Sequence, residues 1–180
     1  MKKQLPFLAG ILFVIASSHL FAQNSSDAIR TLTQSLRSHK SIEVSFTYQT
    51  ISDANEPEEA KQGKAFLQGE AYKFIMDDQH AICDGKTKWH YIVEDEEVMV
   101  GDATDDDNPY KILDNLERDN SGLTPVMDKK GNLKGLEVEL DEGLKLILNI
   151  TEMKFDQDYE DGFFTFDEKA YPDVEVIDMR

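Results

Sequence analysis

Apolar and polar residues alternate with a period of two through most of the chain after residue 41, and this pattern constrains the fold most. Residues 42–48 read Ile-Glu-Val-Ser-Phe-Thr-Tyr, and residues 136–140 read Leu-Glu-Val-Glu-Leu. Such alternation places the apolar side chains on one face of a strand. Further strands are predicted at residues 63–68, 71–77, 80–84, 86–94, 98–100, 144–150 and 163–166. Because short turn sequences separate these strands, we expect an antiparallel sheet with one apolar face.

A hairpin at residues 81–91 carries the chain's only tryptophan. Its turn, Asp84-Gly85, suits the positive φ angles of a tight hairpin connection. After the turn, Trp89 and Tyr91 alternate with polar residues, so both rings fall on one face of the predicted strand. That face offers apolar area without an acid, a base or a nucleophile, and we expect it to line a surface for an apolar ligand.

Two short helices are predicted beside the sheet. Residues 24–27 offer capping side chains, and the apolar residues after them recur at helical spacing, which predicts a helix over residues 27–39. Asn108 and Pro109 then begin a second helix, whose apolar stripe contains Tyr110, Leu113 and Leu116. Many strands and only two short helices indicate an α+β fold, in which the sheet curls on itself or leaves apolar area for a ligand.

The N-terminus has the pattern of a secretory signal peptide. A basic start at residues 1–3 precedes an apolar core over residues 5–20 and then a polar stretch. Cleavage after Ala22 is predicted, with Ser18 as the alternative, which divides the chain into a signal peptide (1–22) and one domain (23–180). No cysteine lies near this segment, so an acylated N-terminal cysteine is not expected.

The composition argues against some partners. The formal net charge is -17, which repels nucleic acid and anionic membrane surfaces. This charge suits either a basic partner or a well-solvated surface on an exported protein, and both interpretations stay open. Because Cys83 is the only cysteine, no intramolecular disulfide can form, and we expect this thiol to lie buried in its strand.

No motif in the sequence predicts catalysis, a cofactor or a metal centre. Asp102, Thr104, Asp106 and Asn108 have the alternate spacing of calcium ligands, but Asp107 and Leu113 stand where a calcium loop carries glycine and glutamate. A solvated loop is therefore expected there. The histidines lack metal-ligand spacing, and no pair of carboxylates is singled out for glycoside cleavage. An enzyme would require a perturbed carboxylate or histidine in a cleft.

Three parts of the sequence resemble the LolA-like periplasmic lipoprotein carriers, in particular their Bacteroidetes branch. They are residues 63–67 with 72–74, residues 82–86 with Trp89 and Tyr91, and residues 164–167 with 171–178. Two departures are clear. Gln68 and Gly69 stand where well-studied members carry a lid-tethering arginine, and the stretch between residues 116 and 133 is short.

This resemblance implies an incomplete, strongly curved antiparallel β-barrel whose mouth is covered by short helices. Its cavity would take the acyl chains of lipoproteins in the periplasm. By the same resemblance, a monomeric carrier without enzyme activity receives its cargo from an inner-membrane ABC transporter and delivers it to an outer-membrane acceptor. The departures imply a smaller cavity, another lipid cargo or a different mode of closing.

Alternation and resemblance together predict which residues line the cavity. The expected lining is Phe46, Phe66, Phe74, Trp89, Tyr91, Leu146 and Leu148, and the expected lid contacts are Tyr110, Leu113 and Leu116. Since a one-residue shift moves every side chain of a strand to the other face, the choice of face is open on each strand. From periodicity alone, the same aromatic residues form an ordinary core under a helix. The alternative function is a cell-envelope binding or sensor domain of this fold, with a filled core and another lipid or a protein as its partner.

Overall fold

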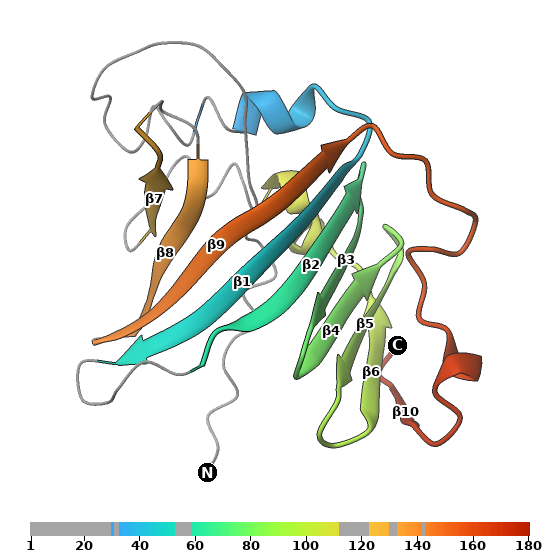
Figure 1. The fold of residues 1–180 in the computed structure, drawn as a ribbon. Helices are drawn as coiled ribbons and strands as arrows, with labels where there is room; N and C mark the ends of the chain where they lie inside the picture. Colours follow the sequence, from blue (N-terminus) through green and yellow to red (C-terminus); the bar gives the residue numbers. More distant parts are fainter. Residues whose placement is uncertain (1–29, 31–32, 53–58, 112–122, 130–132, 142) are drawn as a thin grey trace.

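Ten strands form one sheet in the computed structural model, which describes residue 30 and residues 33–52, 59–111, 123–129, 133–141 and 143–180 (Figure 1). Their order across the sheet is β10-β6-β5-β4-β3-β2-β1-β9-β8-β7. The strands are β1 (Ile42–Ser52), β2 (Lys61–Gln68), β3 (Ala71–Met76), β4 (Gln79–Cys83), β5 (Thr87–Ile92), β6 (Glu97–Asp102), β7 (Leu123–Met127), β8 (Leu133–Asp141), β9 (Leu144–Phe155) and β10 (Glu175–Asp178). Two short 3-10 helices, η1 (Asp105–Asp107) and η2 (Glu168–Ala170), lie between strands.

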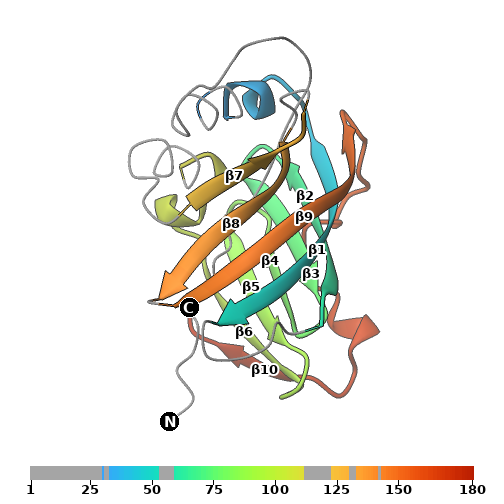
Figure 2. The same cartoon turned by 60° about the vertical axis from the view of Figure 1, so that its left-hand side comes forward.

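Two antiparallel meanders and one parallel edge strand, β10, make up this sheet. Strands β1 to β6 are consecutive neighbours, β7 to β9 form the second meander, and the long strands β1 and β9 join the two. The edge strands β7 and β10 stand at opposite ends of the order, so the sheet does not close on itself. The sheet is curved (Figure 2). The predicted curved antiparallel sheet is therefore confirmed, although helix contributes less to the described residues than an α+β fold suggests.

Short helical segments accompany the sheet. Residues 30 and 33–37 are helical, and the chain turns at Ser38, so the first helix ends slightly earlier than predicted. The hydroxyl of Ser38 donates to the carbonyl oxygen of Ser35 at 2.6 Å and helps to end it. Residues 109–111 are helical, as predicted for the start of the second helix. Leu113, Leu116 and the predicted signal peptide lie outside the described residues.

Alternate residues of each strand lie on opposite faces of the sheet, as the period of two predicts. In β1, the buried side chains are those of Ile42, Val44, Phe46 and Tyr48. Cross-strand pairs extend this face to neighbouring strands, because Val44 pairs with Ala65 in β2 and Ala65 pairs with Phe74 in β3. We call the face that carries Phe46 and Phe74 the inner face, and the opposite face the outer face.

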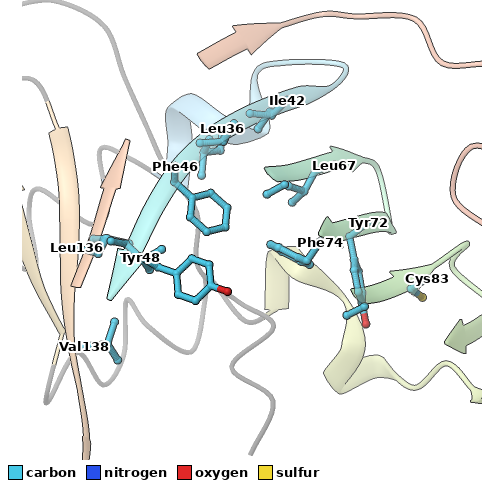
Figure 3. Packing of buried hydrophobic residues seen from close by; sticks show 14 residues of the cluster. Leu36, Ile42, Phe46, Tyr48, Leu67, Tyr72, Phe74, Cys83, Leu136 and Val138 are labelled. Carbon is cyan, nitrogen blue, oxygen red and sulfur yellow. The ribbon is translucent and has the colours of Figure 1, made fainter. Parts of the chain in front are cut away.

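The main hydrophobic cluster lies on the inner face (Figure 3). It unites buried side chains from β1, β2, β3, β4, β8 and β9 with Leu36 of the first helix, which is fully buried. Fully burying a side chain such as leucine or phenylalanine stabilises a fold by roughly 1.5–3 kcal/mol. Cys83 also lies in this cluster, so its thiol is buried as predicted. This apolar cluster, rather than covalent cross-linking, holds the curved sheet together.

The C-terminal segment, residues 156–174, runs along the outer side of the sheet before it reaches β10 (Figures 1 and 2). There it builds a second hydrophobic cluster, in which Phe166 packs on Tyr91 with ring centroids 5.6 Å apart. Beyond this cluster, β10 runs parallel to β6, and Val176 pairs with Val98. Both faces of the sheet therefore carry packed apolar side chains.

Residues 163–166 lie in a turn, so the strand predicted there is wrong. Gly162 has a φ of 84°, a backbone conformation that favours glycine. The backbone N–H and the hydroxyl of Thr165 both donate to the Gly162 carbonyl oxygen, at 3.1 and 2.6 Å. The last strand is instead β10, whose four residues the alternation did not single out.

Candidate functional site

Four of the predicted lining residues lie together on the inner face. Phe46, Phe74 and Leu148 belong to the buried cluster, and Leu146 is half-buried against it. The register explains this arrangement, because Tyr48 pairs with Leu148 and therefore shares its face. The inner face of β1, β3 and β9 thus has the apolar character that the sequence predicted.

Phe66, Trp89 and Tyr91 lie on the outer face, so the predicted lining is divided between two faces of the sheet. Phe66 packs edge-on against Phe163 of the C-terminal segment, with centroids 5.1 Å apart. Tyr91 is buried in the second cluster, and Trp89 packs against it. The hairpin register is the cause: Trp89 pairs with Ile82 rather than with the inward-facing Cys83.

Tyr110, the described member of the predicted lid, is half-buried against the inner cluster. Arg37 of the first helix holds it in two ways. Its Nη2 donates to the carbonyl oxygen of Tyr110 at 3.2 Å, and its guanidinium lies 5.3 Å from the centre of the Tyr110 ring. No sequence pattern predicted Arg37, because a contact across 73 positions leaves no local signal. Gln68 and Gly69, where the carriers that the sequence resembles have an arginine, lie at the end of β2 and in the turn that follows.

Two buried phenols supply polar groups on the inner face. Burial, with a smaller contribution from the nearby Asp78 carboxylate, raises the pKa of Tyr48 to about 12. Burial likewise raises the pKa of Tyr72. Both phenols are therefore neutral at physiological pH, and the hydroxyl of Tyr48 lies 3.4 Å from an Asp78 oxygen.

The acidic loop after β6 is organised by its own hydrogen bonds. One oxygen of Asp107 accepts bonds from the N–H and the hydroxyl of Thr104, both at 2.7 Å, and Lys88 donates to the same carboxylate at 2.9 Å. Burial acts to raise the pKa of Asp107, but these bonds outweigh it and hold the pKa below its usual value. In the described ranges, no group of three or more His, Cys, Asp or Glu side chains is arranged to hold a metal ion.

A groove of about 680 Å³ lies on the outer face. Tyr91 lines it, together with His80 and Ile75 from the neighbouring strands and Tyr171 from the C-terminal segment. The sequence pattern and the resemblance predicted Tyr91 as a lining residue, but of the inner cavity. Nothing in the alternation could reveal Tyr171, because it reaches the groove from a segment without regular strand structure.

No family model matches this sequence, and no curated protein matches it. An uncharacterized conserved protein from Thermus thermophilus superposes with a TM-score of 0.52 at 8% identity, over 86% of this chain and 99% of that chain. A LolA superfamily protein from Nitrosomonas europaea superposes with a TM-score of 0.45 at 10% identity, over 81% of this chain and 99% of that chain. The first likeness shows a shared fold alone, and the second is too distant to carry an argument.

The described part of the chain has no helix with both the length and the apolar character needed to span a bilayer.

Proposed function

We propose that this protein is a carrier that shields the acyl chains of a lipoprotein on the inner face of its sheet and ferries them from the inner to the outer membrane. Binding and release of the cargo need no catalysis. One structural observation carries the proposal: a continuous apolar face lies on the inner side of a sheet that does not close. The sequence resemblance to LolA-like carriers supports the same interpretation.

The inner face offers apolar area that is not yet fully covered. Half-buried side chains surround the buried cluster, chiefly from β8 and β9: Leu133, Leu140, Leu146, Ile150, Met153 and Phe155. An acyl chain laid over them would gain about 0.8 kcal/mol for each methylene removed from water. Because the sheet has free edges at β7 and β10, admitting such a chain breaks no closed ring of hydrogen bonds.

In this proposal, Arg37 acts as the lid tether. It joins the first helix to Tyr110, which packs against the inner cluster. Releasing that contact would uncover apolar surface at the margin of the inner face. The tether therefore comes from a helix, whereas the resemblance would have placed it in a strand near Gln68.

The location and the partners of the carrier belong to the same proposal. A signal peptide over residues 1–22 would export the chain to the periplasm, where an inner-membrane ABC transporter supplies cargo and an outer-membrane acceptor receives it. The net charge of -17 suits basic docking surfaces on both partners. The carrier is proposed to act as a monomer.

One observation favours the alternative, a cell-envelope binding or sensor domain. Phe46 and Tyr48, in the middle of the inner face, are only 8% and 6% exposed. That burial matches the filled core expected of a domain that uses its outer surface to bind a protein. The two functions differ in whether an acyl chain reaches the inner face.

A matched pair of variants tests the proposal. Leu146 and Ile147 are neighbours in β9, both half-buried, and they lie on opposite faces of the sheet. Leu146→Lys places a charge on the inner face, and Ile147→Lys places it on the outer face. A radiolabelled diacylated lipopeptide should co-elute in gel filtration with the wild type and with I147K, and at least about tenfold less with L146K. Equal co-elution with L146K and the wild type would exclude the inner face as the acyl site, provided that circular dichroism shows all three folded.

A further inference from the structure

The outer groove has a floor that spans several strands. Strands β9, β1, β2, β3, β4 and β5 contribute to it, and Tyr171 of the C-terminal segment forms a wall. Its volume of about 680 Å³ is in the range of pockets that hold small organic ligands. The proposed carrier function uses the inner face, so it leaves this groove without a role.

A continuous row of cross-strand pairs forms the floor. Ser45 pairs with Lys64, and Lys64 pairs with Ile75. Ile75 pairs in turn with His80, and His80 pairs with Tyr91. Neighbouring strands are about 4.8 Å apart, so the row runs about 19 Å from β1 to β5. Along it the side chains change from hydroxyl and ammonium, through aliphatic, to aromatic.

Polar groups gather at the end of the groove formed by β9, β1 and β2. Ser45, Thr47 and Thr151 line this end beside Lys64. The Lys64 ammonium is exposed, and among the described residues it has neither an ion-pair partner nor a side-chain hydrogen bond, although the chain is strongly acidic. An unpaired ammonium beside several hydroxyls can bind an anionic head group through charge-assisted hydrogen bonds.

Aromatic groups form the opposite end. The rings of Tyr91 and Tyr171 have centroids 4.9 Å apart, and the His80 ring meets Tyr91 edge-on at 5.4 Å. Phe166 stacks on Tyr171 at 5.1 Å and fixes the wall in place. Burial, aided by the nearby Lys73 ammonium, lowers the pKa of His80, so the His80 ring is neutral at neutral pH. It suits the apolar part of a ligand.

We propose that the outer groove is a second ligand site, which binds a single-chain amphiphile with an anionic head group, such as a long-chain carboxylate. The head group lies beside Lys64 and the hydroxyls of Ser45 and Thr151. The chain crosses Ile75 and ends against the paired rings of Tyr91 and Tyr171. This site is separate from the inner face, and it can be occupied whether or not the carrier proposal holds.

The carboxylates near the groove agree with this orientation. Glu152, which pairs across from Ser45, is engaged by Lys154 at 3.1 Å, and the same ammonium also binds Glu43 at 3.1 Å. Asp77 lines the groove just beyond the end of β3. It would repel an anion placed there, so the head group is directed to the side where Lys64 lies.

Isoleucine methyl groups distinguish the two faces in one experiment. Ile75 lines the outer groove, whereas Ile150 packs against the inner cluster. Protein labelled with ¹³C at its isoleucine δ1 methyls is titrated with dodecanoate below its aggregation concentration. We expect saturable shifts of the Ile75 methyl and intermolecular NOEs from it to the dodecanoate chain. A response confined to Ile150 would overturn the groove proposal while agreeing with the carrier proposal.

Lys64→Gln tests the head-group contact, and Lys145→Gln is its matched control. Lys145 is an exposed lysine on the outer face of β9, and it does not line the groove. Dodecanoate affinity measured at Ile75 should fall about tenfold in K64Q and stay unchanged in K145Q. Dodecyltrimethylammonium, which has the same chain and a cationic head, should not saturate the site. Equal affinity of K64Q and the wild type, or equal binding of the two detergents, would overturn the proposal.

Discussion

The ring of Phe46 lies directly over Gly63 on the inner face of the sheet. The two residues are cross-strand partners in β1 and β2, and a Cβ added at Gly63 would lie 2.5 Å from two ring carbons of Phe46. The glycine therefore makes room for the aromatic ring at the centre of the apolar face.

Gly63→Ala should destabilise the protein by about 1–3 kcal/mol, because the added methyl overpacks the inner face and displaces the Phe46 ring. Urea unfolding at neutral pH measures this change. Gly101→Ala is the matched control, since Gly101 also lies in a strand but a Cβ there would meet only the flexible side chain of Lys88 at 3.5 Å. If G63A were as stable as G101A, the close contact with Phe46 would be wrong.

Gly135→Ala should be costlier than Gly63→Ala. A Cβ at Gly135 would lie 2.0 Å from the carbonyl oxygen of Leu148. This oxygen belongs to the backbone of a paired strand, so it cannot move away as the side-chain ring of Phe46 can. We expect a loss of more than about 3 kcal/mol, or failure to fold, measured as yield and urea midpoint beside G63A. A G135A protein with the wild-type midpoint would contradict the register of β8 and β9.

Phe166→Ala should loosen the C-terminal segment from the outer face. Phe166 is 8% exposed and stacks on Tyr171, so its truncation should cost about 3 kcal/mol. Hydrogen exchange should accelerate at the N–H groups of Glu175 and Met179, which bond to β6 or the turn before it. Phe164→Ala removes a half-buried ring outside this cluster and should leave that exchange unchanged. Equal protection in F166A and the wild type would show that the cluster does not anchor β10.

The Asp107 carboxylate should make stability depend on pH in the acid range. Its pKa in the folded protein is below its ordinary value of 3.8, so its stabilising contribution is complete above that pH and is lost as the pH falls further. Asp107→Asn should therefore lower the free energy of unfolding by about 1 kcal/mol at pH 7. The difference between D107N and the wild type should shrink below about pH 3.8. A difference that stays constant from pH 7 to pH 3 would argue against the bonds from Thr104 and Lys88.

The existence of most strands follows from the sequence, because period-two alternation is a local property of each strand. Which face of one strand continues onto the next is not local. Trp89 and Phe46 each belong to an alternating set of apolar residues. The hairpin register nevertheless places Trp89 beside Ile82 on the outer face. Local alternation also does not predict contacts between distant segments, such as the contact of Arg37 with Tyr110 or of Tyr91 with Tyr171. The sequence therefore predicts the sheet well, and it predicts only in part the two surfaces proposed here to bind ligands.

The most direct test of the carrier proposal is a release assay. Purified protein from residue 23 onward is added to spheroplasts in which labelled outer-membrane lipoproteins have stalled at the inner membrane, and label is counted in the soluble fraction. The proposal predicts that label co-purifies with the wild type and with I147K, and that L146K releases much less. Label that stays in the membrane with all three proteins, while a LolA control releases it, would contradict the proposed transport of lipoproteins.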